Sequence, residues 1–289
     1  MVGRWTGRGS RGASPSRRGR ARILRTQHQS SVRARTLSHS SNSTSSASAI
    51  LRIVADRSEG ERLAADEIES LLKAKPDAAL GLATGGTMTG LYDELSRRHA
   101  AGRVSFARAK GFNLDEYLGL APADPRSFAA YMRASLLERV DFAPGAARLP
   151  RGDAPDAAAE SKGWEEAIAA AGGIDLQLLG IGRNGHIGFN EPGSARDSRT
   201  RVVELDDTTR ADAAAGFGSL ELVPRRAITA GVATILDSRR ILLLAFGRSK
   251  ASIVRRMLRG PVGAECPASW LQGIGHALVV VDREAAAEL

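Results

Sequence analysis

Short apolar segments alternate with segments of helical periodicity from residue 50 to residue 281, and this alternation constrains the fold more than any other feature of the sequence. The strand-like segments are apolar at almost every position, which is typical of strands buried on both faces of a parallel sheet. The segments between them carry apolar residues at three- and four-residue spacing, which indicates helices that cover such a sheet. The sequence therefore predicts an α/β fold with a mainly parallel sheet between two layers of helices.

The expected elements follow one another along most of the chain. The first helix is expected to begin at a capping box formed by Ser58 and Glu61. A stretch over about 205–226 is rich in Thr, Ala, Gly and Asp and breaks the alternation, as expected for a lid or a functional loop. The predicted strands are 50–55, 79–83, 106–114, 175–181, 241–246 and 277–281, and the further predicted helices are 88–99, 127–140, 156–171 and 249–258.

Composition excludes several other classes of protein. Of the 289 residues, 43% are hydrophobic and 25% are charged, as in ordinary globular domains. The longest clear apolar run, 241–246, is far shorter than the ~18–20 residues of a membrane-spanning helix. Cys266 is the single cysteine, so neither an internal disulfide nor a cysteine-based zinc site can form. A reducing compartment is therefore expected.

The net charge of +9 is concentrated at the start of the chain. Residues 1–48 hold 10 of the 41 lysines and arginines and no acidic residue, so the remainder carries 31 basic against 32 acidic side chains. A folded surface for nucleic acid is not indicated, and neither nucleic acid nor membrane is an expected partner of the domain. Because residues 1–48 are Arg/Ser-rich with almost no large apolar side chains, they are predicted to form a disordered tail before one domain over 49–289.

Three interpretations of this tail stay open. It resembles an organellar transit peptide in being rich in Arg and Ser and free of acids. It could equally arise from a start codon placed too far upstream, or act as a nucleic-acid-binding arm. It lacks the apolar core of a secretory signal. The domain is expected in the cytoplasm, or in an organelle if the tail is a transit peptide.

The first motif lies between a predicted strand and a predicted helix and consists of Thr84, Gly85, Gly86 and Thr87. Glycines let backbone N–H groups converge on one point, and the helix N-terminus and the hydroxyl groups add to an anion site. No Gly-Lys-Ser/Thr sequence follows, so this is not a Walker A loop. A phosphate on a small metabolite fits the motif better than ATP, although a plain strand–helix turn would show the same residues.

The second motif is an acidic pair, Asp115 and Glu116, directly after the predicted strand 106–114. Open α/β sheets bind ligands at the carboxyl ends of their strands. A carboxylate at this place could therefore act as a general base. A solvated loop that carries two acidic residues is the alternative.

The third motif is residues 180–192, Gly-Ile-Gly-Arg-Asn-Gly-His-Ile-Gly-Phe-Asn-Glu-Pro, after another predicted strand. It contains the spacing G-x-G-x-x-G, but Pro192 interrupts the helix that a dinucleotide site requires. His186 lies two residues after Asn184 and five before Glu191. A carboxylate and an amide can hold an imidazole in one tautomer and tune it as an acid–base group. Asn184, His186 and Glu191 are therefore candidate catalytic residues.

Together these segments resemble the glucosamine-6-phosphate deaminase family. The resemblance runs from about residue 79 to residue 282, in the family's order. It implies a modified Rossmann-like three-layer α/β sandwich of the sugar-phosphate isomerase/deaminase type, shared with phosphogluconolactonases and ribose-phosphate isomerases. The segments that carry it are LGLATGGT (80–87), FNLDEYLGL (112–120), GIGRNGHIGFNEPGS (180–194), SRTR (198–201) and VPRRAIT (223–229).

The same resemblance implies a reaction of amino-sugar catabolism. Members of the family convert glucosamine 6-phosphate and water to fructose 6-phosphate and ammonia, with no cofactor and no metal. Asp115 would move a proton between C2 and C1 of the sugar, and His186 would transfer protons during ring opening. Asn184 and Glu191 would orient and tune His186.

For substrate binding, the resemblance places residues 84–87 at the phosphate end or against the sugar. Arg225 would contact the phosphate in place of a lysine that many members carry, which keeps the charge. Asn184 occupies a position where many members have Asp. A phosphate-binding arginine of the lid is replaced near Ala215, which removes an interaction of roughly 1.5–3 kcal/mol. The C-terminal segment of the allosteric site in hexameric members is also missing, so allosteric control is expected to be absent or altered.

Other functions remain open at this point. The natural substrate could be a related sugar phosphate such as galactosamine 6-phosphate. The same fold also supports 6-phosphogluconolactone hydrolysis, but the resemblance disfavours it because the lactonase site lacks the Asn-Glu-Pro ending. A sugar-phosphate sensor without catalysis is the third alternative. Monomer and homo-oligomer are equally compatible with the sequence.

Overall fold

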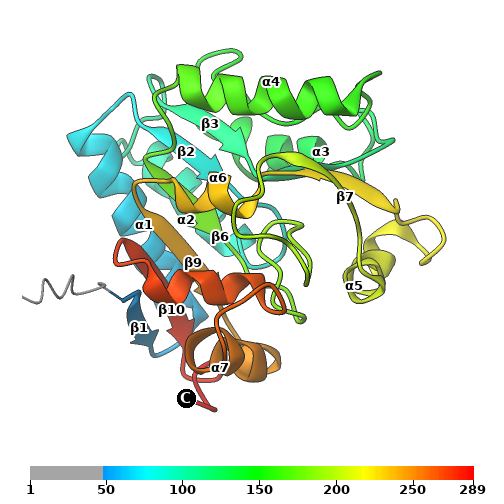
Figure 1. Ribbon diagram of the computed structural model, residues 1–289. Helices are drawn as coiled ribbons and strands as arrows, with labels where there is room; N and C mark the ends of the chain where they lie inside the picture. Colours follow the sequence, from blue (N-terminus) through cyan, green and yellow to red (C-terminus); the bar gives the residue numbers. More distant parts are fainter. Residues whose placement is uncertain (1–47) are drawn as a thin grey trace, which may run out of the picture. The chain divides into compact units, whose positions relative to one another are not determined.

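The computed structural model describes residues 48–289, and the predictions made for the tail over 1–48 therefore lie outside the described residues except for Ser48. A seven-stranded sheet forms the centre of the described part, with the strand order β1-β10-β9-β6-β2-β3-β5 (Figure 1). All neighbouring strands in it are parallel. The strands are β1 (Ile50–Val54), β2 (Ala79–Leu82), β3 (Lys110–Asn113), β5 (Ala147–Arg148), β6 (Leu176–Leu179), β9 (Ile241–Ala245) and β10 (Ala277–Asp282).

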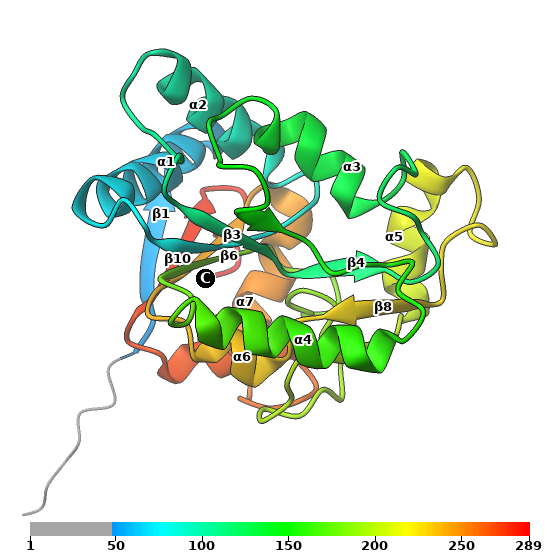
Figure 2. The ribbon, with the colours of Figure 1, turned by 90° about the horizontal axis from the view of Figure 1, so that it is seen from above.

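Helices cover both faces of this sheet, which confirms the predicted three-layer α/β arrangement. The helices α1 and α2 lie on one face, and α4 and α6 lie on the other (Figure 2). The strands β2, β6 and β9 are buried along their whole length, as their continuous apolar sequence requires. The helices are α1 (Arg57–Ala74), α2 (Thr89–Ala100), α3 (Phe128–Met132), α4 (Ala157–Ala170), α5 (Asp207–Phe217), α6 (Val232–Leu236) and α7 (Ala251–Arg259).

A second sheet, which the sequence did not predict, branches from the first. It has three antiparallel strands in the order β4 (Asp115–Tyr117), β8 (Arg226–Thr229) and β7 (Arg201–Glu204). One residue, Leu114, separates β3 from β4, so the chain passes directly from the large sheet into the small one. These strands are only three or four residues long, and their partners are distant in sequence, so no local period reveals them.

Half of the predicted lid, residues 207–217, is helical. The helix α5 connects β7 to β8 and lies beside the second sheet (Figures 1 and 2). Asp206 caps it by accepting a hydrogen bond from the N–H of Thr208 at 2.8 Å. Phe217 at its C-terminal end is buried in an aromatic cluster with Tyr117, Phe128 and Phe189. The broken apolar period arises because α5 buries few apolar side chains.

Two local expectations about the ends of elements are wrong. The N-cap of α1 is Asp56, which accepts from the N–H of Glu59 at 2.8 Å, so Ser58 and Glu61 already lie within the helix. The predicted strand 106–114 is paired only from Lys110, where β3 begins. Phe106 is buried in a turn instead, and its N–H donates to the carboxylate of Asp141 at 2.6 Å.

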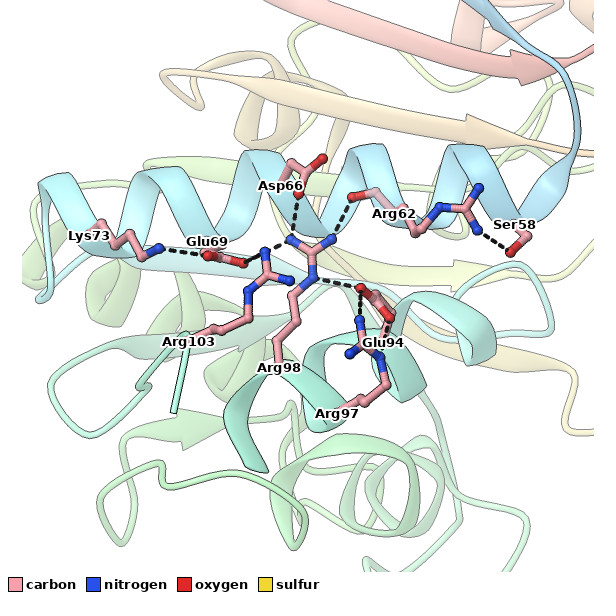
Figure 3. A network of polar contacts seen from close by, with 9 residues as sticks. All are labelled: Ser58, Arg62, Asp66, Glu69, Lys73, Glu94, Arg97, Arg98 and Arg103. Carbon is pink, nitrogen blue, oxygen red and sulfur yellow. Dashed lines mark hydrogen bonds and ion pairs between the residues drawn. The ribbon is translucent and has the colours of Figure 1, made fainter. Parts of the chain in front are cut away.

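A network of ion pairs joins α1 to α2 (Figure 3). The guanidinium of Arg98 is 3% exposed and contacts Glu94 at 2.7 Å, Asp66 at 2.6 Å and Glu69 at 2.9 Å. Hydrogen bonds from Lys73, and then from Arg98 and Arg103, lower the pKa of Glu69 to about 2. The network holds in place the two helices that cover one face of the sheet.

Candidate active site

A cavity of about 290 Å³ opens at the carboxyl ends of four neighbouring strands. The loops that follow β2, β3, β6 and β9 form its floor, and α5 lies across it. In an open parallel sheet, this is the edge at which ligands bind. The three motifs singled out from the sequence follow β2, β3 and β6, so the sheet brings all of them to one place.

The loop of the first motif lines one end of the cavity through Thr84, Gly85 and Thr87. Gly85 has a φ of +109°, a conformation that side chains other than hydrogen disfavour. The hydroxyl of Tyr131 donates to the carbonyl of Gly85 at 3.0 Å, and the guanidinium of Arg57 binds the carbonyl of Gly86. Gly86 itself does not line the cavity. The carbonyl groups of Gly85 and Gly86 are thus fixed by hydrogen bonds, while the space next to both Cα atoms is empty and open to a ligand.

The two carboxylates of the second motif have different environments. Glu116 accepts hydrogen bonds from the N–H groups of Tyr117, Phe128 and Ala129, each at 2.9 Å, so its role is to anchor the start of α3. Asp115 is 4% exposed and lines the cavity, and its Oδ1 has no hydrogen-bond partner. Burial, and secondarily the charge of Glu116, raises the pKa of Asp115 to about 8. Asp115 is therefore the carboxylate available to accept a proton from a ligand.

The third motif holds an imidazole against a carboxylate. His186 lines the cavity, and its Nδ1 lies 3.3 Å from Oε2 of Glu191 and 3.1 Å from Oγ1 of Thr209. Asn184 donates from Nδ2 to Glu191 at 2.8 Å and accepts from the backbone N–H of His186 at 3.2 Å. Asn184 therefore orients the imidazole through Glu191 and the backbone, without touching the ring.

The electrostatics of this group favour one arrangement of protons. Burial would raise the pKa of Glu191, but hydrogen bonds from His186, Thr209 and Asn184 outweigh it and lower that pKa. An ionised carboxylate only accepts hydrogen bonds, so we assign the ring proton to Nδ1. Nε2 is then the atom free to exchange protons with a ligand. A Cβ at Gly182 would lie 2.2 Å from Cε1 of His186, so glycine is needed there for the ring to occupy its place.

A lysine that sequence reasoning missed also lines the cavity. Lys250 follows β9 and donates from Nζ to the carbonyl of Ile181 at 2.8 Å. Burial lowers the pKa of Lys250, and the carboxylate of Asp212 opposes that effect. The sequence offered one signal for Lys250, which is its position after β9. Because β9 is a fully buried interior strand of the parallel sheet, the polar residues that follow it lie at the same edge as the three motifs.

Arg225, the expected phosphate ligand, is exposed and does not line this cavity. Its backbone carbonyl accepts from Leu205 at 2.8 Å, while Ala227, two residues further, is fully buried. Ala215 is exposed as well. The residues of α5 that line the cavity are Thr209, Asp212 and Ala213.

No set of His, Cys, Asp and Glu side chains suited to holding a metal ion occurs within residues 48–289. Within the same residues, no helix combines the length and the apolar character needed to span a membrane.

The fold and the cavity define an α/β enzyme in which a buried carboxylate and a carboxylate-paired imidazole share one site with a lysine. Residues 57–280 match the family model of glucosamine-6-phosphate isomerases/6-phosphogluconolactonase, and the chain belongs to this family. It is 50% identical to a glucosamine-6-phosphate deaminase of Arthrobacter sp. (strain FB24) over 227 residues, which are 78% of this chain and 87% of that protein.

Solved structures agree with this assignment. A monomeric glucosamine-6-phosphate deaminase superimposes with a TM-score of 0.81 and 44% identity, over 83% of this chain and 100% of that chain. A 6-phosphogluconolactonase from Trypanosoma brucei superimposes with a TM-score of 0.66 at 21% identity, over 83% of this chain and 98% of that chain. The second likeness shows the fold alone.

Proposed function

We propose that this protein converts glucosamine 6-phosphate and water to fructose 6-phosphate and ammonia. The observation that carries the proposal is the shared cavity: Asp115, the His186–Glu191 pair, Lys250 and the glycine loop all meet there. Curated relatives at about 50% identity carry the name glucosamine-6-phosphate deaminase. The chemistry requires a base, a group that exchanges protons with oxygen, and a site for phosphate, and side chains suited to each of these roles line the cavity.

The phosphate binds between Lys250 and the loop of Thr84–Thr87. Nζ of Lys250 uses one proton on Ile181, and the remaining protons can bind phosphate oxygens. The backbone N–H groups of the glycine loop supply further donors. Arg225, which is exposed, is not needed in this arrangement.

His186 opens the sugar ring. Its Nε2 takes the proton of the hydroxyl on C1 and returns a proton to the ring oxygen, which yields the open-chain aldehyde. Glu191 stabilises the imidazolium that forms between these two transfers. Asn184 keeps the carboxylate of Glu191 in place.

Asp115 then isomerises the open chain. The ionised carboxylate removes the proton on C2 while the carbonyl oxygen on C1 gains a proton given up by the ammonium group of the substrate, which gives an enolamine. The carboxyl group of Asp115 then delivers the proton taken from C2 to C1. The product is an imine at C2, and water hydrolyses it to the ketone with release of ammonia. Because burial raises the pKa of Asp115 to about 8, the fraction of competent enzyme increases as the pH rises toward that value.

One assay tests this proposal against its alternatives. Purified enzyme is given glucosamine 6-phosphate, galactosamine 6-phosphate and the two unphosphorylated sugars, and ammonia release is measured. We expect turnover of glucosamine 6-phosphate and negligible turnover without phosphate. Preference for galactosamine 6-phosphate would reassign the substrate. In parallel measurements, hydrolysis of added 6-phosphogluconolactone would favour the lactonase, and calorimetric binding of a sugar phosphate without any turnover would favour the sensor.

Replacing Lys250 with Met is expected to raise KM for glucosamine 6-phosphate by about 10- to 100-fold, with a smaller change in kcat. A hydrogen bond to a charged group contributes roughly 1.5–3 kcal/mol, and phosphate is held similarly in the ground and transition states. The matched control is Arg225→Met, which removes an exposed charge outside the cavity and should leave KM nearly unchanged. The reverse result, with KM raised only by Arg225→Met, would restore the original assignment of Arg225.

The segment 1–48 is expected to be dispensable for catalysis, because the residues that line the cavity lie between Ala83 and Lys250. An enzyme that begins at residue 49 should have the same kcat and KM as the full chain. A change of more than about threefold in either constant would show that the segment contributes to the site. We further propose that the enzyme acts in the cytoplasm on a small sugar phosphate without binding nucleic acid, and that an organellar location applies only if residues 1–48 direct import.

A further inference from the structure

The lid helix α5 makes direct polar contacts with the catalytic pair. The residue that caps it, Asp206, donates its N–H to Oε1 of Glu191 at 3.3 Å. Thr209, which is 6% exposed, has its Oγ1 3.1 Å from Nδ1 of His186, and its hydroxyl helps to lower the pKa of Glu191. Both residues belong to the first turn of α5 and its cap. Two groups from the lid therefore contact the side of the His186–Glu191 pair that faces away from Nε2.

A second contact holds the same helix one turn further on. The carboxylate of Asp212 pairs with the guanidinium of Arg183 through both oxygens, with Nε at 3.0 Å from Oδ2 and Nη2 on Oδ1. Arg183 and His186 belong to the same loop, and Thr209 and Asp212 are three residues apart on one face of α5. The helix is thus attached to the catalytic loop at two points on its cavity side.

We propose that Thr209 is a positioning residue that makes the orientation of His186 depend on the docking of α5, and that the Arg183–Asp212 pair holds α5 in the docked position. The proposal rests on the proposed function and deepens it. With α5 docked, Nδ1 of His186 faces both the carboxylate of Glu191 and the hydroxyl of Thr209. With α5 displaced, the pair loses the hydroxyl of Thr209 and the N–H of Asp206 together.

The small apolar contribution of α5 makes these polar contacts important. Its hydrophobic anchors are Phe217 at the C-terminal end and the partly buried Ala213 and Ala214. The first turn packs no large apolar side chain, since its buried residues are Thr209 and Arg210. Polar contacts therefore hold the N-terminal half of the helix: those with the loop of His186, and the hydrogen bond that Arg210 donates to the carbonyl of Leu220 at 2.9 Å. The catalytic pair is complete only when the cavity is covered, which protects a reactive enolamine from solvent.

The test uses Thr209→Val, which keeps the shape and removes the hydroxyl, and Thr209→Ser, which restores it. Thr208→Val is the matched control, because Thr208 is the exposed neighbour on the same helix. We expect Thr209→Val to lower kcat by about three- to tenfold, the effect of one hydrogen bond, with little change in KM. Thr209→Ser should recover most of this loss, and Thr208→Val should resemble the wild type.

A second readout does not require turnover. The ¹⁵N chemical shifts of the His186 ring, assigned by their loss in His186→Gln, report which nitrogen carries the proton. Thr209→Val should shift them, and Thr208→Val should not. Unchanged shifts together with wild-type kcat in Thr209→Val would overturn the positioning role. If the wild type releases no ammonia from any sugar, the proposed function fails, but the ring shifts still decide whether Thr209 acts on His186.

The role of the Arg183–Asp212 pair is tested by a separate measurement. Asp212→Asn should speed hydrogen exchange of the backbone amides in α5 by about two- to fivefold, because the bidentate pair with Arg183 is lost and an ion pair this exposed contributes modestly. Exchange in α2, on the other side of the cavity, should stay the same. Unchanged exchange in α5 would show that the Arg183–Asp212 pair does not hold the helix in its docked position.

Discussion

Replacing Asp115 with Asn is expected to lower kcat for ammonia release from glucosamine 6-phosphate by about 10²–10⁴, the usual contribution of a general acid–base group. The amide has the same shape but cannot accept the proton from C2. KM should change little, because the phosphate contacts are untouched. The matched control is Asp93→Asn, which neutralises an exposed carboxylate of α2 that pairs with Arg139. Turnover of a folded Asp115→Asn protein within threefold of the wild type would show that another group is the base.

The same substitution should stabilise the fold at alkaline pH. The carboxyl of Asp115 has an ordinary pKa of 3.8 in the unfolded chain and about 8 in the folded protein. Between these values the native state holds a proton that the unfolded state has released, so the stability of the wild type falls as pH rises. Asp115→Asn removes this loss. The difference in Tm between variant and wild type should grow from pH 4 to pH 8 and then level off.

Replacing Arg98 with Met is expected to destabilise the fold by about 3–5 kcal/mol, because removing one partner of a buried ion pair leaves its carboxylates uncompensated. The carboxylates affected are those of Glu69, which is itself buried, and of Glu94 (Figure 3). Urea unfolding followed by circular dichroism measures the change. The kinetic constants of the folded fraction should remain close to those of the wild type, since the network does not line the cavity.

Arg97→Met provides the matched control. Arg97 pairs with the same Glu94 at 2.7 Å, but its side chain is 61% exposed, so its removal should change the free energy of unfolding very little. The pH dependence gives a second check. The lowered pKa of Glu69, about 2, provides stability that is present above its ordinary value of 4.5 and is lost as the pH falls toward 2. The deficit of Arg98→Met should therefore shrink over that interval. Equal losses for the two arginine variants would show that the burial of Arg98 has no energetic consequence.

The residues proposed to be catalytic could be singled out from the sequence because they follow predicted strands within short motifs. The apolar strands before Thr84, Asp115 and Gly180 indicated one parallel sheet, and the carboxyl ends of parallel strands share an edge. The structure brings Asp115 and His186 to one cavity at that edge. The structure also gives the two neighbouring carboxylates different roles. The backbone N–H groups at the start of α3 donate to Glu116 and leave Asp115 free to face the cavity.

Lys250, Thr209 and the second sheet needed the tertiary structure. Lys250 lies 64 residues after His186 in the sequence, and lysine and threonine occur in most surface loops, so their types carry no signal by themselves. The resemblance pointed to Arg225 for the phosphate, but the side chain of Arg225 is exposed, while its neighbour Arg226 begins β8. The period of apolar residues and the chemistry of turns act over a few residues, and the sequence by itself determined most strands of the large sheet, the helices that cover it and the three motifs. The long-range packing of the two sheets and α5 determines which loops face one another across the cavity. That arrangement exists only in the folded chain.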